Sequence, residues 1–190
     1  MRKKIILSAI AIVGCIYAFN SCSKLAQQLA QGITWTGVDE TITVPIVNDT
    51  AMHTSIGTGS FSYNLDSLIK NKTNNALGLS NVDTFEFTSC TLTILGPDSN
   101  NNFQNFQLAQ ATFSTNANTT AATIGEVDNN PDTYSATLSL PVNNSVNMKS
   151  YLNPVGITTF NYTLAGKMRK ATTTALTVQA HVSYYIHVKP

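Results

Sequence analysis

The chain has 190 residues, of which 43% are hydrophobic and 11% are charged, and its formal net charge is +1. Three of its eleven basic residues lie at positions 2–4, so the rest of the chain holds eight against ten acidic residues, a net charge of about −2. The one basic block beyond the N-terminus, at positions 167–170, is predicted to be a turn between strands. Nucleic-acid binding requires a basic face, so we expect no nucleic-acid partner.

The first 21 residues have the order of a secretory signal peptide. A basic head is followed by an apolar run at positions 5–19, and small Ser21 stands directly before Cys22. The run is shorter than the roughly 20 residues that a membrane-spanning helix requires, which favours a cleaved signal peptide over the alternative of an uncleaved signal anchor.

The junction Ser21-Cys22-Ser23 resembles the end of a type II, lipoprotein signal peptide, especially as it is written in Bacteroidota. The resemblance covers about the first 24 residues and departs from the strictest motif, since Phe19 stands where Leu is preferred. It implies cleavage before Cys22 and acylation of Cys22 with fatty acids such as palmitate. Cys15 ends a second matching stretch, with a shorter apolar run before it, and stays an alternative.

Multiple acyl chains anchor a protein stably, whereas a single chain holds it only marginally. We therefore expect a cell-envelope lipoprotein on the outer membrane. Residues 23–27 lack the acidic cluster that resembles a surface-export signal in Bacteroidota lipoproteins, which favours the periplasmic face over the cell surface. The expected organisation is a signal peptide at 1–21, an anchor and tether at 22–32, and one domain at 33–190. A short helix or plain tether is predicted within residues 25–31, before Gly32.

From position 33 the apolar period changes to two, which is typical of strands. A strand is predicted around residues 41–46, and Pro45 places it at a sheet edge. A second is predicted at residues 60–65, followed by a short helix at residues 66–70.

Two later stretches change the parity of their alternation. Phe85 and Phe87 fall on one parity and Cys90 and Leu92 on the other, which predicts a β-bulge near Thr88. Residues 106–113 repeat this change, and the turn-forming stretch at 96–102 lies between the two segments. We therefore expect these two strands to pair as a hairpin or to be neighbours.

The remaining elements are a weak strand at 121–127, a strand at 134–140, a helix at 145–152 capped by Ser145, and a strand at 160–164. The clearest strand lies at 176–188, where apolar residues occupy every even position. Together these elements predict an all-β fold: an antiparallel β-sandwich of about seven to nine strands with one or two short helices. A closed β-barrel is the alternative.

No motif for catalysis or cofactor binding is present, so we expect no enzyme activity, no cofactor and no metal. His181 and His187 share one strand face but lie roughly 20 Å apart. Residues 98–102 begin like a calcium loop, but Phe103 stands where glycine is needed. Glu126 and Asp128 are attributed to chance proximity, and Cys90 to a buried small apolar residue.

Three residues could contact a ligand: Trp35 near the start of the domain, and Tyr185 with His181 on the polar face of the last strand. Thr50 and Ser67 lie in Asp-Thr-Ala and Asp-Ser-Leu triplets, which resemble acceptor motifs for O-glycosylation in Bacteroidota. The favoured function is a membrane-anchored, non-enzymatic structural or interaction module with envelope proteins or glycans as partners. A glycan- or small-ligand-binding surface lipoprotein is the alternative, and a hydrolase whose residues converge only in the fold is the third reading.

Overall fold

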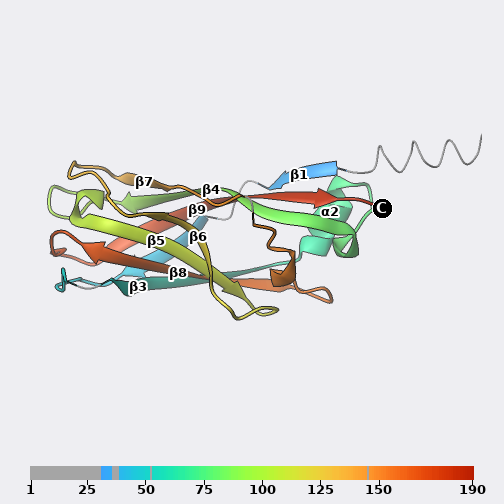
Figure 1. The fold of residues 1–190 in the computed structure, drawn as a ribbon, viewed down its shortest axis with the longest axis horizontal. Coiled ribbons are helices and arrows are strands. Elements are labelled where there is room, and N and C mark those ends of the chain that lie inside the picture. The colour runs from blue at the N-terminus through green and yellow to red at the C-terminus, as the bar shows by residue number, and fades with distance from the viewer. Residues whose placement is uncertain (1–30, 36–38, 52, 145) are drawn as a thin grey trace, which may run out of the picture.

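In the computed structural model, which describes residues 31–35, 39–51, 53–144 and 146–190, two antiparallel sheets pack face to face (Figure 1). The predicted β-sandwich is thereby confirmed, and the closed-barrel alternative is wrong. The signal peptide, Cys15, Cys22 and the tether up to residue 30 lie outside the described residues, as does the proposed cap Ser145. None of the helices in the described part of the chain is long and apolar enough to cross a membrane.

The first sheet has the order β1-β9-β4-β7, with β2 also pairing with β9. Its strands are β1 (Gln31–Trp35), β2 (Asp39–Val44), β4 (Val82–Leu95), β7 (Thr137–Leu140) and β9 (Leu176–Val188). The second sheet has the order β3-β8-β5-β6 and consists of β3 (Thr54–Tyr63), β5 (Phe106–Thr115), β6 (Ala122–Val127) and β8 (Thr158–Met168). The helix α2 (Leu65–Lys72) and the 3₁₀ turns η1 (Leu79–Asn81), η2 (Phe103–Asn105) and η3 (Lys149–Tyr151) complete the described elements.

Strand β9 is the centre of the first sheet because its alternation is unbroken. All seven of its even-numbered residues are buried, from Leu176 to Val188. β4 pairs with one side of β9. On the other side, β2 pairs with residues 176–181 of β9 and β1 with residues 184–188. β2 ends at Val44, directly before Pro45, and pairs with β9 alone among the described strands, so its predicted edge position is confirmed.

The bulge predicted near Thr88 is confirmed. Phe87 pairs with Tyr184 and Ser89 with Ser183, so Thr88 is the extra residue of β4. The insertion lets Phe87 and Cys90 both face the core although their positions differ in parity. The second parity change corresponds to an irregularity between Phe106 and Leu108 at the start of β5.

Three predictions about local structure need correction. β4 and β5 belong to different sheets, so they do not form a hairpin, and the segment between them crosses from one layer to the other. The predicted helix at 145–152 is only η3, because the backbone N–H of Met148 donates to the Phe85 carbonyl of β4. The predicted strand at 60–65 begins earlier, at Thr54, and ends at Tyr63, because Asn64 caps α2 by accepting from the Ser67 N–H.

Aromatic rings fill the space between the sheets. Tyr184 stacks on Phe85 with a centroid separation of 5.4 Å, and Phe87 meets Phe113 edge to face at 4.7 Å. Cys90 is buried beside this cluster, as predicted, and burial raises the pKa of its thiol to about 12. Such offset and edge contacts stabilise an interior beyond the area that they bury.

Candidate functional site

The outer face of the first sheet carries the predicted ligand contacts Tyr185 and His181. Thr34 of β1 and Glu86 of β4 are the cross-strand partners of Tyr185. The Tyr185 ring lies over Gly32, where a Cβ atom would stand 2.5 Å from the phenolic oxygen. Because Gly32 has no side chain, the partly exposed Tyr185 ring can pack flat against the sheet at this position.

His181 and His187 face the same side of β9 but bind different carboxylates. His181 Nδ1 lies 2.7 Å from Asp39 Oδ1, and His187 Nδ1 lies 3.5 Å from Asp83 Oδ2. Lys189, whose Nζ lies 2.7 Å from Asp83, is the main cause of the lowered pKa of that carboxyl, and His187 adds to it. His181 is four residues from Tyr185, about 13 Å along the strand, so the two predicted contacts share a face without touching.

Trp35 has a different place from the one expected. Its side chain is only 9% exposed, and its ring stacks on Tyr184 and packs against Tyr63, each at a centroid distance of 4.7 Å. It lies on the inward parity of β1, with Ile33, while Thr34 points outward. The prediction of Trp35 as an exposed binding platform is wrong because the ring belongs to the core.

The two proposed glycosylation acceptors are exposed. Thr50 follows β2 in a segment where Asp49 Oδ1 accepts the Ala51 N–H at 2.7 Å. Ser67 lies in the first turn of α2. Modification of either hydroxyl remains a prediction.

A groove that the sequence did not indicate lies at the end of the sandwich that holds α2 and the C-terminus (Figure 1). Three adjoining hollows of about 380, 270 and 170 Å³ share Ser80. Their other lining residues come from the start of α2, η1, the start of β4, the segment 149–156 and the last two residues: Asn64, Asp66, Leu79, Asn81, Val82, Asp83, Lys149, Leu152, Pro154, Val155, Gly156, Lys189 and Pro190.

One wall of the groove is fixed by Asp66. Its Oδ2 lies 2.6 Å from Lys70 Nζ, and its Oδ1 accepts the Leu79 N–H at 2.9 Å. These contacts, with Lys70 first, lower the pKa of the Asp66 carboxyl. The carboxylate therefore ties α2 to η1.

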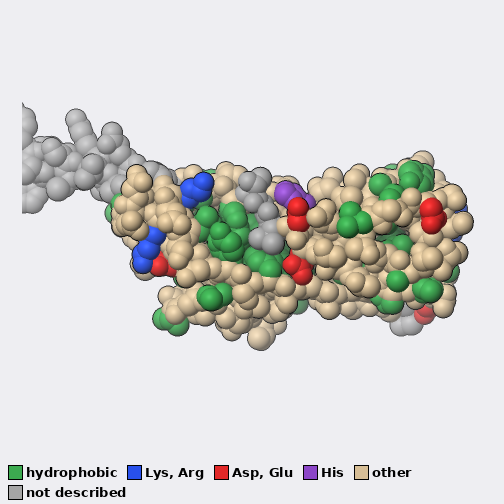
Figure 2. All heavy atoms as spheres, turned by 180° about the vertical axis from the view of Figure 1, so that it is seen from behind, with side chains coloured by type: hydrophobic (Ala, Val, Ile, Leu, Met, Phe, Trp, Pro, Cys, Tyr) green, Lys and Arg blue, Asp and Glu red, His purple; other side chains and the backbone are tan. Residues whose placement is uncertain are grey.

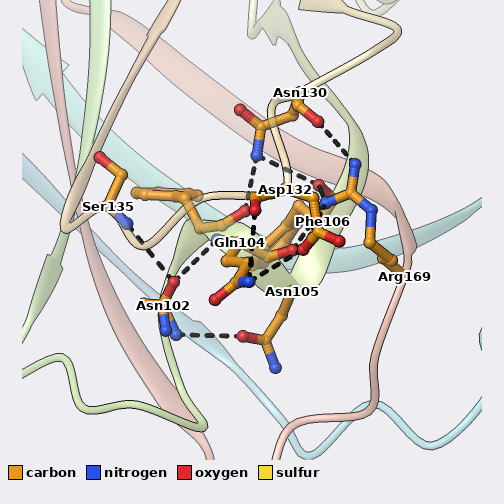
Figure 3. A network of polar contacts seen from close by, with 9 residues as sticks. Asn102, Gln104, Asn105, Phe106, Asn130, Asp132, Ser135 and Arg169 are labelled. Carbon is orange, nitrogen blue, oxygen red and sulfur yellow. Dashed lines mark hydrogen bonds and ion pairs between the residues drawn. The ribbon is translucent and has the colours of Figure 1, made fainter.

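A network of polar side chains lies at the opposite end of the sandwich, where the start of β5 pairs with the end of β8. Figure 3 shows its members. The Arg169 guanidinium donates to the carbonyls of Gln104, Phe106 and Asn130, at 2.7, 3.2 and 2.6 Å. The Asn130 amide donates in turn to the carbonyls of Phe103 and Phe106. Lys167 and Met168 belong to β8, so only the second half of the predicted basic turn is a connection.

This network is a clamp between loops. Every buried side-chain nitrogen or oxygen among the described residues has a hydrogen-bond partner, so the amides of the network are engaged with the chain itself. Sequence reasoning missed the clamp because its members are scattered over residues 102–169. Only the density of Asn near the turns could have hinted at it.

The segment that begins like a calcium loop is a turn closed on itself. Asp98 accepts from the Asn100 N–H at 2.7 Å and from the Asn101 side-chain amide at 2.8 Å. These bonds, the Asn101 amide first, lower the pKa of the Asp98 carboxyl. No three His, Cys, Asp or Glu side chains of the described residues gather closely enough to hold a metal ion.

Comparison with known proteins gives no family. No protein-family model matches the chain, and no curated protein sequence matches it. The VP2 protein in a subviral particle of infectious bursal disease virus is similar over 84% of this chain, at 11% identity and a TM-score of 0.39. A particle of the giant freshwater prawn nodavirus is similar over 85% of this chain, at 8% identity and a TM-score of 0.32.

This chain spans 33% of the length of the bursal disease virus protein and 94% of the nodavirus protein. At these TM-scores the likenesses carry no argument about function, which must come from the residues of this chain.

Proposed function

We propose that this protein is a lipid-anchored component of the cell envelope whose sandwich domain is a non-enzymatic structural or interaction module. The observation that carries the proposal is the junction Ser21-Cys22 at the end of an apolar run, nine residues before the first strand begins at Gln31. An acylated Cys22 would hold the domain close to the outer membrane, with the periplasmic face favoured.

The outer strand faces support a role in contact rather than in proton transfer. Thr41, Gln179, Thr93 and Thr137 form one row across four strands of the first sheet. Thr58, Thr163, Thr112 and Thr123 form a similar row across the second sheet. Rows of hydroxyl and amide groups offer hydrogen bonds to a neutral partner such as an envelope protein or a glycan.

The anchor is tested by metabolic labelling with radioactive palmitate in a Gram-negative host. Cys22→Ser is expected to abolish labelling and to release the protein from the membrane fraction after export. Cys15→Ser is the matched control and is expected to retain both. Normal labelling of the Cys22→Ser chain would overturn the proposal.

A second candidate function, glycan or small-ligand binding, is favoured by Tyr185. Its partly exposed ring lies on the first sheet between Thr34 and Glu86, and an aromatic ring beside hydrogen-bonding groups suits a sugar. Loss of glycan-array binding in Tyr185→Ala would support this function. Tyr134→Ala, which removes a 56% exposed ring elsewhere, is the control.

A further inference from the structure

The end of the domain at which the described chain begins carries exposed apolar side chains. Val155 is 91% exposed and Ile157 is 53% exposed. Figure 2 shows hydrophobic side chains projecting from the lower left of the molecule, the side on which this end lies in that view. Large apolar side chains with such exposure indicate contact with another apolar phase when they gather in one place.

The loop that carries these side chains is held in shape by Asn153. Its side-chain oxygen accepts the Val155 N–H at 3.3 Å, its side-chain amide donates to the Ile157 carbonyl at 3.3 Å, and its backbone N–H donates to Thr158 Oγ1 at 3.1 Å. Asn116 donates to the same Ile157 carbonyl at 3.0 Å. The loop is therefore braced in a form that presents Val155 outward.

Basic side chains lie at the same end of the sandwich as this apolar tip. Lys149 lines two of the three hollows of the groove, and Lys72 ends α2. Neither makes an ion pair with any carboxylate of the described residues, whereas Asp66 and Asp83 are already paired with Lys70 and Lys189. The end thus combines apolar side chains with uncompensated positive charge, which suits the headgroup region of an anionic membrane.

The length of the chain before β1 decides which end can reach a membrane. Gln31 pairs with Val188, and Val188 with Val82, so β1 begins at the end that holds the groove. Nine residues from Cys22 reach about 30 Å at most, even when fully extended. Leu95, which is 48% exposed, lies at the far end of β4, about 40 Å from Val82.

We infer that the groove end of the domain rests on the membrane, with Val155 and Ile157 inserted at the boundary between headgroups and acyl chains. This inference rests on the proposed lipid anchor at Cys22. Anchor and loop then form two points of attachment, which stand the strands upright on the membrane. The outer strand faces are then perpendicular to the lipid surface and open to the periplasm.

The test places a fluorescent bimane at Val155→Cys in the full chain, purified from membranes and reconstituted into vesicles of phosphatidylethanolamine and phosphatidylglycerol. Labelling is specific because acylation occupies the Cys22 sulfur and cleavage removes Cys15. Cys90 is buried, and its thiol pKa is raised to about 12. Leu95→Cys, at a 48% exposed position on the far end, is the matched control.

Brominated acyl chains are expected to quench the bimane at position 155 several-fold more than the one at 95, and iodide in the buffer to do the reverse. Equal quenching at both positions would overturn the inference while leaving the anchor standing. Protection of position 155 from iodide in vesicles, without quenching by the brominated chains, would also overturn it, since a second copy and not lipid would then cover the loop. Mass spectrometry of the same sample reports on Cys22, and an unmodified Cys22 would overturn the proposed function itself and this inference with it.

Discussion

The phenolic hydroxyls of Tyr162 and Tyr184 hydrogen-bond to each other across the interior of the sandwich. Tyr162 comes from β8 in one sheet and Tyr184 from β9 in the other, and both side chains are buried. A buried hydroxyl without a partner is costly, and here each hydroxyl supplies the other. The pair is therefore a polar link between the two layers within the apolar core.

Removing one hydroxyl of this pair is expected to destabilise the fold. Tyr184→Phe leaves the Tyr162 hydroxyl without its partner, which is expected to lower the free energy of unfolding by about 1–3 kcal/mol. Urea denaturation measures the loss. The double variant Tyr162→Phe/Tyr184→Phe should lose less than the two single variants combined, because it leaves no orphaned hydroxyl. Strictly additive losses would show that the pair does not act as a unit.

The same burial predicts sensitivity to alkaline pH. Burial raises the pKa of both tyrosines above their ordinary value of 10.0 and that of the Cys90 thiol from 9.0 to about 12. Above pH 9–10 the unfolded chain releases protons that the folded chain retains, so the free energy of unfolding falls as pH rises. The expected slope is about 1.4 kcal/mol per pH unit for each group that is ionised only when unfolded. Denaturation midpoints at increasing pH check this, and the double Phe variant should fall less steeply.

Local alternation predicted much of the fold. The unbroken parity of β9 and the parity change at Thr88 depend only on which side of a strand each residue faces, and the sequence carries that information directly. The membership of β4 and β5 in different sheets could not be predicted, because the turn residues between them indicate a reversal and not which layer the next strand joins.

Some parts of the candidate surfaces could be predicted from strand alternation, whereas others form only in the folded chain. The alternation of β9 predicted that Tyr185 and His181 point outward. The same alternation in β1, where Trp35 shares its parity with apolar Ile33, indicates that Trp35 points inward. The groove was missed because α2, η1, the segment 149–156 and the C-terminal residues meet only in the folded chain. The loop that exposes Val155 depends on Asn153, whose hydrogen bonds have no sequence signature stronger than a turn.

The close approach of β6 to the segment after β7 predicts that Gly125 cannot be replaced by a larger residue without loss of stability. This residue forms an isolated bridge with Val142, and a Cβ atom at Gly125 would lie 2.5 Å from the Pro141 carbonyl oxygen. Because backbone atoms must move to admit a methyl group, Gly125→Ala is expected to lower the free energy of unfolding by about 1–3 kcal/mol. Gly156→Ala is the control, since its new Cβ atom would have its nearest neighbour at 3.5 Å, and it should change stability by less than about 0.5 kcal/mol. Equal effects in a urea titration would contradict the close approach.

Arg169 is expected to stabilise the far end of the sandwich through its three hydrogen bonds rather than through net charge. Its guanidinium donates to three carbonyls, of Gln104, Phe106 and Asn130, and hydrogen bonds to a charged donor are stronger than neutral ones. Arg169→Ala should lower the free energy of unfolding by about 2 kcal/mol, reduced from the full value of three bonds because water can reach the partly exposed site. It should also speed amide hydrogen exchange at residues 104–106 and 130. Lys170→Ala removes the same charge from an exposed neighbour and should leave both measurements unchanged. Equal losses of stability in Arg169→Ala and Lys170→Ala would show that net charge causes the loss. The hydrogen bonds of Arg169 would then not be what holds these loops together.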